Sequence, residues 1–378
     1  MNNAIRCAIL GTGVMGKRYA ALLDGHQIAG MSLAAVCCRS EASQKWAKES
    51  LSSSVYVCGS EDELYAHSGA FDAVLVVTPH KLHPAMTIRA LNEGKHVMCD
   101  KPTGITATDA SAMQQAAVRA GRIYATMCHQ RSYASHRKVK ELIDAGAVGE
   151  IERASLIDTE SLRTRYYHQS SSWRSSWTRE GGGLLINQGH HLLDFWLWLF
   201  GLPEALYADI PYGKYNSFMV DDEASLVLDY PGRMTGIIIL STGEGGITQR
   251  LEIAGTRGCI LLDGNTLKLT RFGQDIRAYA GSVQVTSRQE LTTTTEEYVF
   301  GRDEDAYEIM LNNFGAAIRG EAPLIAPGRD GIATLELINA AYLSAWEGRR
   351  LQLPVDGQRY LLELQKHEKL EQANRDGA

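Results

Sequence analysis

The sequence predicts an α/β domain with a parallel sheet, followed by an α+β domain with a large open, mainly antiparallel sheet. Short runs that are apolar on both faces alternate with helical segments up to about residue 128, which is typical of a parallel sheet covered on both sides. After Gly149 the predicted strands lengthen and turns such as Tyr230–Gly232 separate them, which favours antiparallel pairing. We therefore expect a first domain at 1–128, a second at 129–362 and a charged tail at 363–378.

The expected first domain alternates strand and helix throughout. Each strand is a short apolar run that stops at a turn-forming or polar residue, and a helical segment follows it. Gly94 and Gly121 stand where two helices should end, because glycine is a common C-terminal stop. The expected strands are 6–10, 32–38, 55–57, 73–77, 96–99 and 123–126, and the expected helices are 16–24, 41–49, 61–66, 82–92 and 106–120.

The expected second domain contains longer strands that follow one another as meanders. Helices are expected before these strands, within them and after them. The expected strands are 151–159, 205–212, 224–229, 234–241, 248–254, 258–263 and 266–271, and the expected helices are 137–145, 184–200, 304–318 and 331–347.

Composition and charge exclude several classes of protein. Lys and Arg number 38 against 44 Asp and Glu, so the net charge of −6 gives no basic excess for binding nucleic acid. The densest apolar stretch, 192–200, contains Asp194 and is too short to span a membrane. Seven scattered cysteines without zinc-ligand spacing, and an N-terminus without an apolar leader, indicate reduced thiols in a cytoplasmic protein that holds no metal.

A glycine-rich turn joins the first predicted strand to the first helix. Its first glycine permits a tight turn, its second lets the backbone approach a pyrophosphate, and its third lets the helix pack on the strand. Unpaired N–H groups and the positive end of the helix dipole would then face the phosphates. A turn kept only for packing is the alternative. The expected dinucleotide-binding residues of this turn are Gly11, Gly13, Val14, Met15 and Gly16.

The end of the second predicted strand bears on which dinucleotide binds. NAD sites usually carry Asp or Glu there, which accepts hydrogen bonds from the ribose 2′-hydroxyl. This chain has Cys38 followed by Arg39 and Ser40, so a 2′-phosphate would meet a guanidinium group and a hydroxyl instead of a carboxylate. The sequence favours NADP over NAD, and a surface arginine in a turn is the alternative.

Two further segments carry groups suited to proton transfer. Lys101 follows a predicted parallel strand at the edge where open α/β sheets bind ligands, although a lysine there is usually a solvated charge. If 184–200 is one helix, then Asn187, His191 and Asp194 share one face of it. A buried histidine satisfied by a structural carboxylate is the alternative, and the glycines at 181–183 favour a ligand because they permit close approach to the backbone.

Four motifs together resemble a known family. They are GTGVMG at 11–16, VTPHKLHP at 77–84, GKHVMCDKP at 94–102 and GGGLLINQGHHLLD at 181–194. In this order they are similar to the glucose-fructose oxidoreductase/inositol dehydrogenase/MocA family over roughly residues 4 to 350. The resemblance implies an N-terminal Rossmann domain, oxidation or reduction of sugars and polyols with NAD(P), and homodimers or homotetramers that pair through the face of the second sheet.

The resemblance also implies roles for individual residues. His191 matches the family's catalytic histidine, which moves the substrate's hydroxyl proton, and Lys101 matches the lysine of its Glu-Lys-Pro motif, which stabilises the alkoxide. Asn187 replaces a frequent aspartate, so it can position the hydroxyl but cannot take its proton. The other residues expected near the cofactor are Thr78, Pro79, His83 and Asp100, the last of which replaces the usual glutamate.

Cations and aromatic side chains concentrate at 163–168 and 173–179. Aromatic faces suit the C–H face of a sugar ring, and guanidinium groups suit hydroxyls, carboxylates or phosphates. Packing at a domain interface is the alternative. The expected substrate-binding residues are His129, Arg131, Tyr167, Trp173, Arg174, Asn187 and His191.

The expected function is an NAD(P)-dependent dehydrogenase or reductase acting on a CH–OH group of a sugar, glycoside or polyol. Two other functions fit the same motifs. A glycoside hydrolase that uses bound NAD as a transient oxidant would hold a cofactor that never turns over. A non-catalytic dinucleotide-sensing regulator would show no chemistry that depends on His191.

Overall fold

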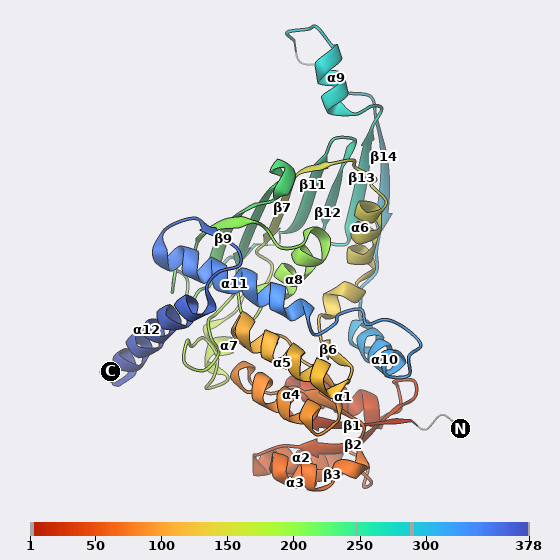
Figure 1. Ribbon diagram of the computed structural model, residues 1–378, viewed down its shortest axis with the longest axis vertical. Helices are drawn as coiled ribbons and strands as arrows, with labels where there is room; N and C mark the ends of the chain where they lie inside the picture. The colour runs from red at the N-terminus through yellow and green to blue at the C-terminus, as the bar shows by residue number, and fades with distance from the viewer. Residues whose placement is uncertain (1–3, 247, 288–290, 377–378) are drawn as a thin grey trace. The chain divides into compact units, whose positions relative to one another are not determined.

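The computed structural model describes residues 4–246, 248–287 and 291–376 of the chain (Figure 1). These residues divide into two compact units. The first unit contains residues 4–132, 179–181 and 304–335, and the second contains residues 133–178, 182–303 and 336–376. Each unit is built on a sheet of its own.

The sheet of the first unit has six strands in the order β3-β2-β1-β4-β5-β6, and every neighbouring pair is parallel. The order reverses between β1 and β4, the point at which doubly wound sheets bind ligands beyond the carboxyl ends of their strands. The expected parallel Rossmann-type sheet is confirmed. Its strands are β1 (Ile5–Leu10), β2 (Met31–Cys37), β3 (Tyr56–Cys58), β4 (Ala73–Val76), β5 (His96–Cys99) and β6 (Tyr124–Thr126).

Each face of this sheet has its own apolar core. Successive side chains of β1 alternate between the two, with Ile9 in one cluster and Leu10 in the other. A helix from far along the chain contributes Phe314 to the cluster that contains Ile9. The helices of the unit are α1 (Val14–Asp24), α2 (Glu41–Ser50), α3 (Glu61–Ala66), α4 (His83–Asn92), α5 (Ala107–Ala120) and α10 (Ala306–Ile318), and short 3₁₀ turns lie at Ser68–Ala70, His80–Leu82 and His129–Ser132.

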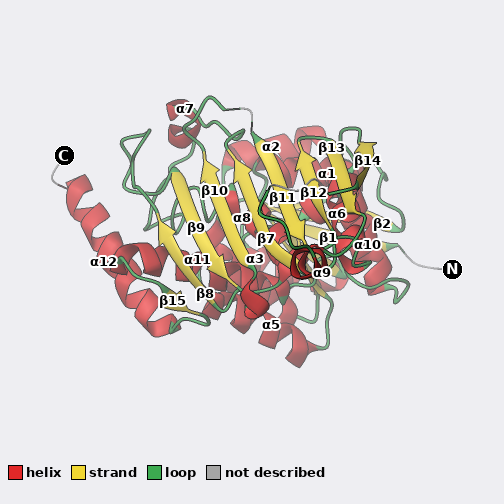
Figure 2. Cartoon of the chain, turned by 90° about the horizontal axis from the view of Figure 1, so that it is seen from above, coloured by secondary structure: helices red, strands yellow, loops and turns green. Residues whose placement is uncertain are grey.

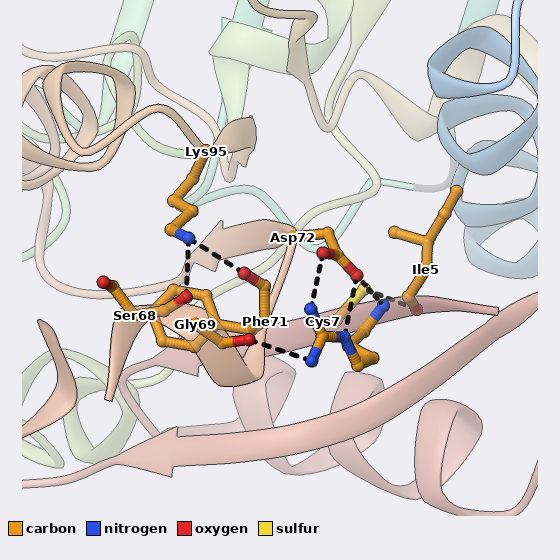
Figure 3. Close-up of polar contacts among 8 residues, drawn as sticks. Ile5, Cys7, Ser68, Gly69, Phe71, Asp72 and Lys95 are labelled. Atoms are coloured by element: carbon orange, nitrogen blue, oxygen red, sulfur yellow. Dashed lines mark hydrogen bonds and ion pairs between the residues drawn. The ribbon is translucent and has the colours of Figure 1, made fainter. Parts of the chain in front are cut away.

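The amino end of the parallel sheet is fixed by charged side chains (Figure 3). The guanidinium group of Arg6 donates to both oxygens of Asp72, at 3.1 and 2.8 Å. Nζ of Lys95 donates to the carbonyl oxygens of Ser68 and Phe71 at 2.6 and 3.0 Å. The Arg6 bonds tie the start of β1 to the turn that leads into β4, and the Lys95 bonds tie the start of β5 to the same turn.

The sheet of the second unit has nine strands in the order β14-β13-β12-β11-β7-β10-β9-β8-β15 (Figure 2). All neighbouring pairs are antiparallel except β7 with β10, which is parallel, so the expected mainly antiparallel sheet is confirmed. The strands are β7 (Ile151–Asp158), β8 (Ala205–Asp209), β9 (Glu223–Asp229), β10 (Thr235–Ser241), β11 (Gln249–Gly255), β12 (Gly258–Asp263), β13 (Thr266–Phe272), β14 (Thr293–Val299) and β15 (Leu351–Gln352).

One face of this sheet is buried under helices. In β9 the side chains of Leu226 and Leu228 are buried, whereas Val227 between them is exposed. Two of the covering helices contact each other through His136 and Phe195, whose rings stack at 3.7 Å between centroids. The helices of the second unit are α6 (Ala134–Asp144), α7 (Arg165–Gln169), α8 (Gly189–Phe200), α9 (Ile276–Ser282), α11 (Asp330–Glu347), which both units share, and α12 (Gly357–Asp376).

The start of α8 and the C-terminal segment differ from the expected bounds. The expected helix at 184–200 is wrong at its start, because α8 begins only at Gly189 and Leu184–Gln188 form a turn. The expected charged tail at 363–378 is helical through Asp376, and its last two residues lie outside the described part. No helix in the described part of the chain is long and apolar enough to cross a membrane.

Candidate active site

The glycine-rich turn of the first unit has little room for side chains at its two ends. Gly11 has φ +96°, and a Cβ there would lie 2.6 Å from the carbonyl oxygen of Val77 on the neighbouring strand. A Cβ at Gly16 would overlap the carbonyl oxygen of Gly11. A Cβ at Gly13 would meet no atom within 4 Å. The outer glycines are therefore required by packing, whereas the middle one leaves the backbone uncovered.

The open backbone at Gly13 lies at the N-terminus of α1. No side chain caps this helix and no acidic residue lies in its first turn, while Val14 is 85% exposed and Met15 is partly exposed. The first N–H groups of a helix have no partner within it and carry partial positive charge. Uncovered N–H donors beside an uncovered backbone fit a pyrophosphate, so the residues present suit a dinucleotide.

The carboxyl end of β2 leads directly into α2. Arg39 and Ser40 are both exposed there, and Ser40 is the N-cap residue of α2. Its hydroxyl accepts from the backbone N–H of Ser43 at 3.2 Å and donates to the hydroxyl of Ser43 at 2.8 Å. Ser40 thus caps α2, and of the two residues expected to bind a 2′-phosphate, Arg39 has the side chain that is not used for capping.

The carboxyl ends of β4 and β5 are joined by a buried histidine. The two ring nitrogens of His83 lie 2.6 Å from the carbonyl oxygen of Thr78 and 2.7 Å from that of Pro102. Burial lowers the pKa of His83, while the two carbonyl oxygens act in the opposite direction. His83 therefore holds the segments that carry Pro79 and Lys101.

The residue pair after β5 includes a partly buried carboxylate. Oδ1 of Asp100 accepts from the backbone N–H of Lys101 at 2.8 Å, and the hydroxyl of Tyr19 lies 3.5 Å from Oδ2. Burial raises the pKa of Asp100, while the ammonium group of Lys101 acts in the opposite direction. The two charges are neighbours at the carboxyl edge of the parallel sheet.

The two residues expected to bind substrate after β6 are buried within the first unit. His129 stacks on Tyr307 of α10, with 4.3 Å between ring centroids. Nη1 of Arg131 donates to Oδ2 of Asp330 at 2.6 Å and to the carbonyl oxygen of Ile325 at 3.3 Å. The charge of Arg131 is therefore already compensated, and both side chains serve to attach residues 304–335 to this unit.

In the second unit a buried aspartate forms the turn before α8. The carboxylate of Asp221 accepts from the backbone N–H groups of Gly183 and Leu185, at 2.8 and 2.7 Å, and from the hydroxyl of Tyr342 at 2.8 Å. A Cβ at Gly182, where φ is +144°, would overlap the hydroxyl of Tyr342. Burial raises the pKa of Asp221. Close approach of Tyr342 accounts for Gly182, and approach of a ligand to these glycines stays a prediction.

The expected proton-transfer residues lie in this turn and on α8. Asn187 is almost fully buried in the turn, and His191 is partly exposed in the first turn of the helix. His190 and Asp194 are completely or almost completely buried. Asn187 therefore precedes the helix on which it was expected to share a face with His191.

A tyrosine connects two of the expected substrate residues to this turn. The hydroxyl of Tyr167 accepts from Nη1 of Arg174 at 2.6 Å and from Nε2 of Gln188 at 2.9 Å. Cζ of Arg174 also lies 4.7 Å from the ring centroid of Trp173. Tyr167, Trp173 and Arg174 thus contact one another. Tyr167 also contacts Gln188, which directly follows Asn187 in the sequence.

Sequence reasoning did not select several residues of this arrangement. Asp221 and Gln188 were not among the expected site residues, and Arg163, which lies near the ring of Tyr167, was expected only as part of the charged segment 163–168. The run of three acids at 221–223 was the available signal for Asp221. Lys101 belongs to the first unit and His191 to the second, and their convergence on one substrate stays a prediction. Among the described residues no group of three or more His, Cys, Asp and Glu side chains is arranged to hold a metal.

Two family models match the chain along most of both units. One, described as an oxidoreductase family with an NAD-binding Rossmann fold, matches residues 5–127, and the other, the GFO/IDH/MocA C-terminal domain, matches residues 136–261. The chain belongs to the GFO/IDH/MocA oxidoreductase family. The expected family is therefore confirmed, as is the enzyme class of an NAD(P)-dependent dehydrogenase or reductase acting on CH–OH groups.

Relatives in this family include enzymes with named activities. The chain is 26% identical over 307 residues to an NADP(+) scyllo-inositol 2-dehydrogenase of Bacillus subtilis, covering 78% of this chain and 82% of that protein. It is 24% identical over 295 residues to a D-glucoside 3-dehydrogenase of Escherichia coli, covering 75% and 79%. The solved WlbA dehydrogenase of Chromobacterium violaceum, in complex with NADH and UDP-GlcNAcA, superposes with a TM-score of 0.78 at 25% identity, covering 94% and 97%.

Proposed function

We propose that this enzyme transfers hydride between NAD(P) and a hydroxyl or carbonyl carbon of a sugar, glycoside or polyol. The uncovered backbone of Gly13 at an uncapped helix N-terminus is the observation that carries the proposal, because it fits a dinucleotide and a Cβ at Gly13 would meet no atom of the described residues within 4 Å. Relatives named as inositol and glucoside dehydrogenases support the substrate class.

The cofactor would be held by the first unit. The backbone from Gly11 to Gly16 would bind the pyrophosphate, and the segments after β4 and β5 would hold the nicotinamide half. Arg39 supports NADP over NAD, because an exposed guanidinium group without a nearby strand-end carboxylate suits a 2′-phosphate. When bound, the cofactor supplies the hydride acceptor or donor.

The protein's own groups would manage the proton and the oxygen. His191 would remove the proton from the reacting hydroxyl in oxidation and return it in reduction. Lys101 would stabilise negative charge that develops on the same oxygen, and Asn187 would orient the hydroxyl by hydrogen bonding. These roles require that the enzyme bind its substrate with residues of both units. The proposal also includes a cytoplasmic location and a homodimer or homotetramer.

A substrate screen tests the proposal directly. Sugars, glycosides and inositols are incubated with NAD or NADP, and absorbance at 340 nm is followed. We expect turnover with at least one class of polyol and a lower KM for NADP than for NAD. Lys101→Ala should lower kcat strongly while the melting temperature stays unchanged. A folded, cofactor-binding protein that turns over none of these compounds would contradict the proposal.

A further inference from the structure

Two arginines of the second unit lie against the same tyrosine ring. Cζ of Arg163 is 4.9 Å from the ring centroid of Tyr167, and Cζ of Arg174 is 4.4 Å from it. Arg174 also donates to the hydroxyl of this tyrosine. Two positive charges are thus held near each other by one aromatic side chain, an arrangement that costs energy through their mutual repulsion.

The two arginines have few partners in the part of the chain that the structure describes. Among those residues neither Arg163 nor Arg174 forms an ion pair, and Nε of each is buried without a hydrogen-bond partner. Asp222 is the acid whose charge acts on the neighbouring His168, but its carboxylate accepts from the backbone N–H groups of Lys214, Tyr215 and Asn216 at 3.1, 2.9 and 2.9 Å. The carboxylate oxygens of Asp222 therefore already bind the backbone of the loop at 214–216.

The two guanidinium groups also affect the pKa of the neighbouring His168. Burial lowers the pKa of His168, and Arg174 and Arg163 lower it further against the opposite effect of Asp222. Its Nδ1 lies 2.6 Å from the hydroxyl of Ser175. A neutral imidazole here adds no compensating charge, so the surroundings of Tyr167 remain electropositive.

The arginine pair is joined to the residues proposed to act on the substrate. The hydroxyl of Tyr167 that binds Arg174 also accepts from Gln188, which directly follows Asn187 and is the N-cap residue of the helix carrying His191. On the other side, the backbone N–H of Arg163 donates to the carbonyl oxygen of Thr242 at 2.8 Å, just after β10. Arg163 and Arg174 are each partly exposed as residues, although Nε of each is buried.

We propose that Arg163 and Arg174 form a subsite for an anionic group, a carboxylate or a phosphate, carried by the sugar or polyol substrate. Guanidinium groups match the planar oxygen pairs of both anions, and an anion there removes the repulsion between the two arginines. The inference rests on the proposed function, since it makes this enzyme selective for acidic over neutral members of that substrate class. Tyr167 and Gln188 set the position of the subsite next to Asn187.

Calorimetric binding to the NADH-saturated protein tests the subsite without turnover. The probes are D-glucuronate for a carboxylate, D-glucose 6-phosphate for a phosphate, and D-glucose as the neutral reference. We expect one of the two acids to bind at least about tenfold more tightly than glucose. Arg163→Gln and Arg174→Gln should each remove about tenfold of that preference, and Arg163→Lys and Arg174→Lys should restore part of it. The matched control is Arg165→Gln, an exposed arginine of the same segment.

The outcomes separate the subsite from the proposed function. Equal affinity for acidic and neutral probes, or an acid preference that survives both glutamine variants, would overturn the subsite even if neutral sugars are turned over. An arginine-dependent acid preference without any absorbance change at 340 nm, when D-glucuronate and D-glucose 6-phosphate are added to the compounds of the screen, would uphold the subsite and remove the proposed function. If the glutamine variants do not fold, the lysine variants and the wild-type acid-to-neutral ratio still decide the question.

Discussion

Gly16 and Gly11 approach each other so closely that a Cβ on Gly16 would overlap the carbonyl oxygen of Gly11. The contact joins the first turn of α1 to the end of β1, and it fixes where the N-terminus of that helix points. The middle glycine of the same turn faces open space. Glycines in one motif thus serve two different purposes, and substitution separates them.

Gly16→Ala should destabilise the protein by about 1–3 kcal/mol, because the extra methyl forces backbone atoms apart. Gly13→Ala meets no atom and should unfold at the same denaturant concentration as the wild type. It should nevertheless weaken NAD(P) binding, since the methyl stands where the pyrophosphate is proposed to lie. Urea titrations and cofactor fluorescence measure both effects. Equal stability losses in the two variants would contradict this division of roles.

Replacing Asp221 should disturb the turn before α8. An asparagine has one acceptor oxygen where the carboxylate accepts from Gly183, Leu185 and Tyr342, so Asp221→Asn leaves buried donors unpaired and should cost about 1–3 kcal/mol. Asp209→Asn, at an exposed acid, is the matched control. Chemical unfolding measures the difference between the variants. A variant as stable as the control would show that the turn forms without this carboxylate.

The turn at Asp221 also shows why the sequence misplaced the start of α8. Leu184–Gln188 are apolar or helix-compatible, so local pattern alone extends the helix back to Leu184. In the fold, the N–H of Leu185 donates to a carboxylate 36 residues away, and the N–H of Leu184 donates to the carbonyl oxygen of the same aspartate, so long-range bonds replace helical ones. Local patterns do predict the Gly11–Gly16 turn and the parallel strands, because both depend on residues adjacent in sequence.

Other features depend on partners that no local pattern reveals. The helix at Ala306–Ile318 was expected. Its sequence pattern does not predict that Phe314 packs in the apolar core of the first unit. Strands β7 and β10 pair in parallel although about eighty residues of chain separate them. The expected meander would instead pair consecutive strands in antiparallel order. The segments with Arg163 and Arg174 were singled out for their charge, yet only the fold shows that neither arginine forms an ion pair among the described residues.

The Arg6–Asp72 pair should make stability depend on pH at the acid end. The hydrogen bond from Arg6 lowers the pKa of Asp72, so the folded pKa lies below the unfolded value of about 3.9. Its contribution is therefore present above about pH 4 and lost as pH falls through the folded pKa. Both side chains are over a third exposed, so Asp72→Asn should cost only about 0.5 kcal/mol at pH 7. Unfolding free energies of wild type and variant should converge as the pH falls through the folded pKa of Asp72; a constant difference would contradict the assignment.

The C-terminal helix should restrain the segment that follows Arg174. Glu371 is only 4% exposed, and its Oε2 accepts from the hydroxyl of Ser176 at 3.1 Å and the backbone N–H of Thr178 at 2.8 Å. Glu371→Gln weakens these charge-assisted bonds, so amide hydrogen exchange at 175–178 should become several-fold faster. Glu363→Gln, in a surface pair with Lys366 on the same helix, is the control. Unchanged exchange in the Glu371 variant would show that α12 does not hold this segment.

The adjacent histidines of α8 offer the sharpest test of the proposed proton transfer. His190 is fully buried, whereas His191 is partly exposed on the next position of the helix. His191→Ala should lower kcat by roughly 10²–10⁴-fold with little change in the melting temperature, because a positioned acid–base group contributes about that much to rate. His190→Ala should do the reverse, since it removes a buried ring and costs about 1–3 kcal/mol while the reacting groups stay in place. Turnover at 340 nm and thermal unfolding of both variants are compared. A His191 variant that keeps its kcat, or a His190 variant that loses activity without losing stability, would assign the proton transfer to a different side chain.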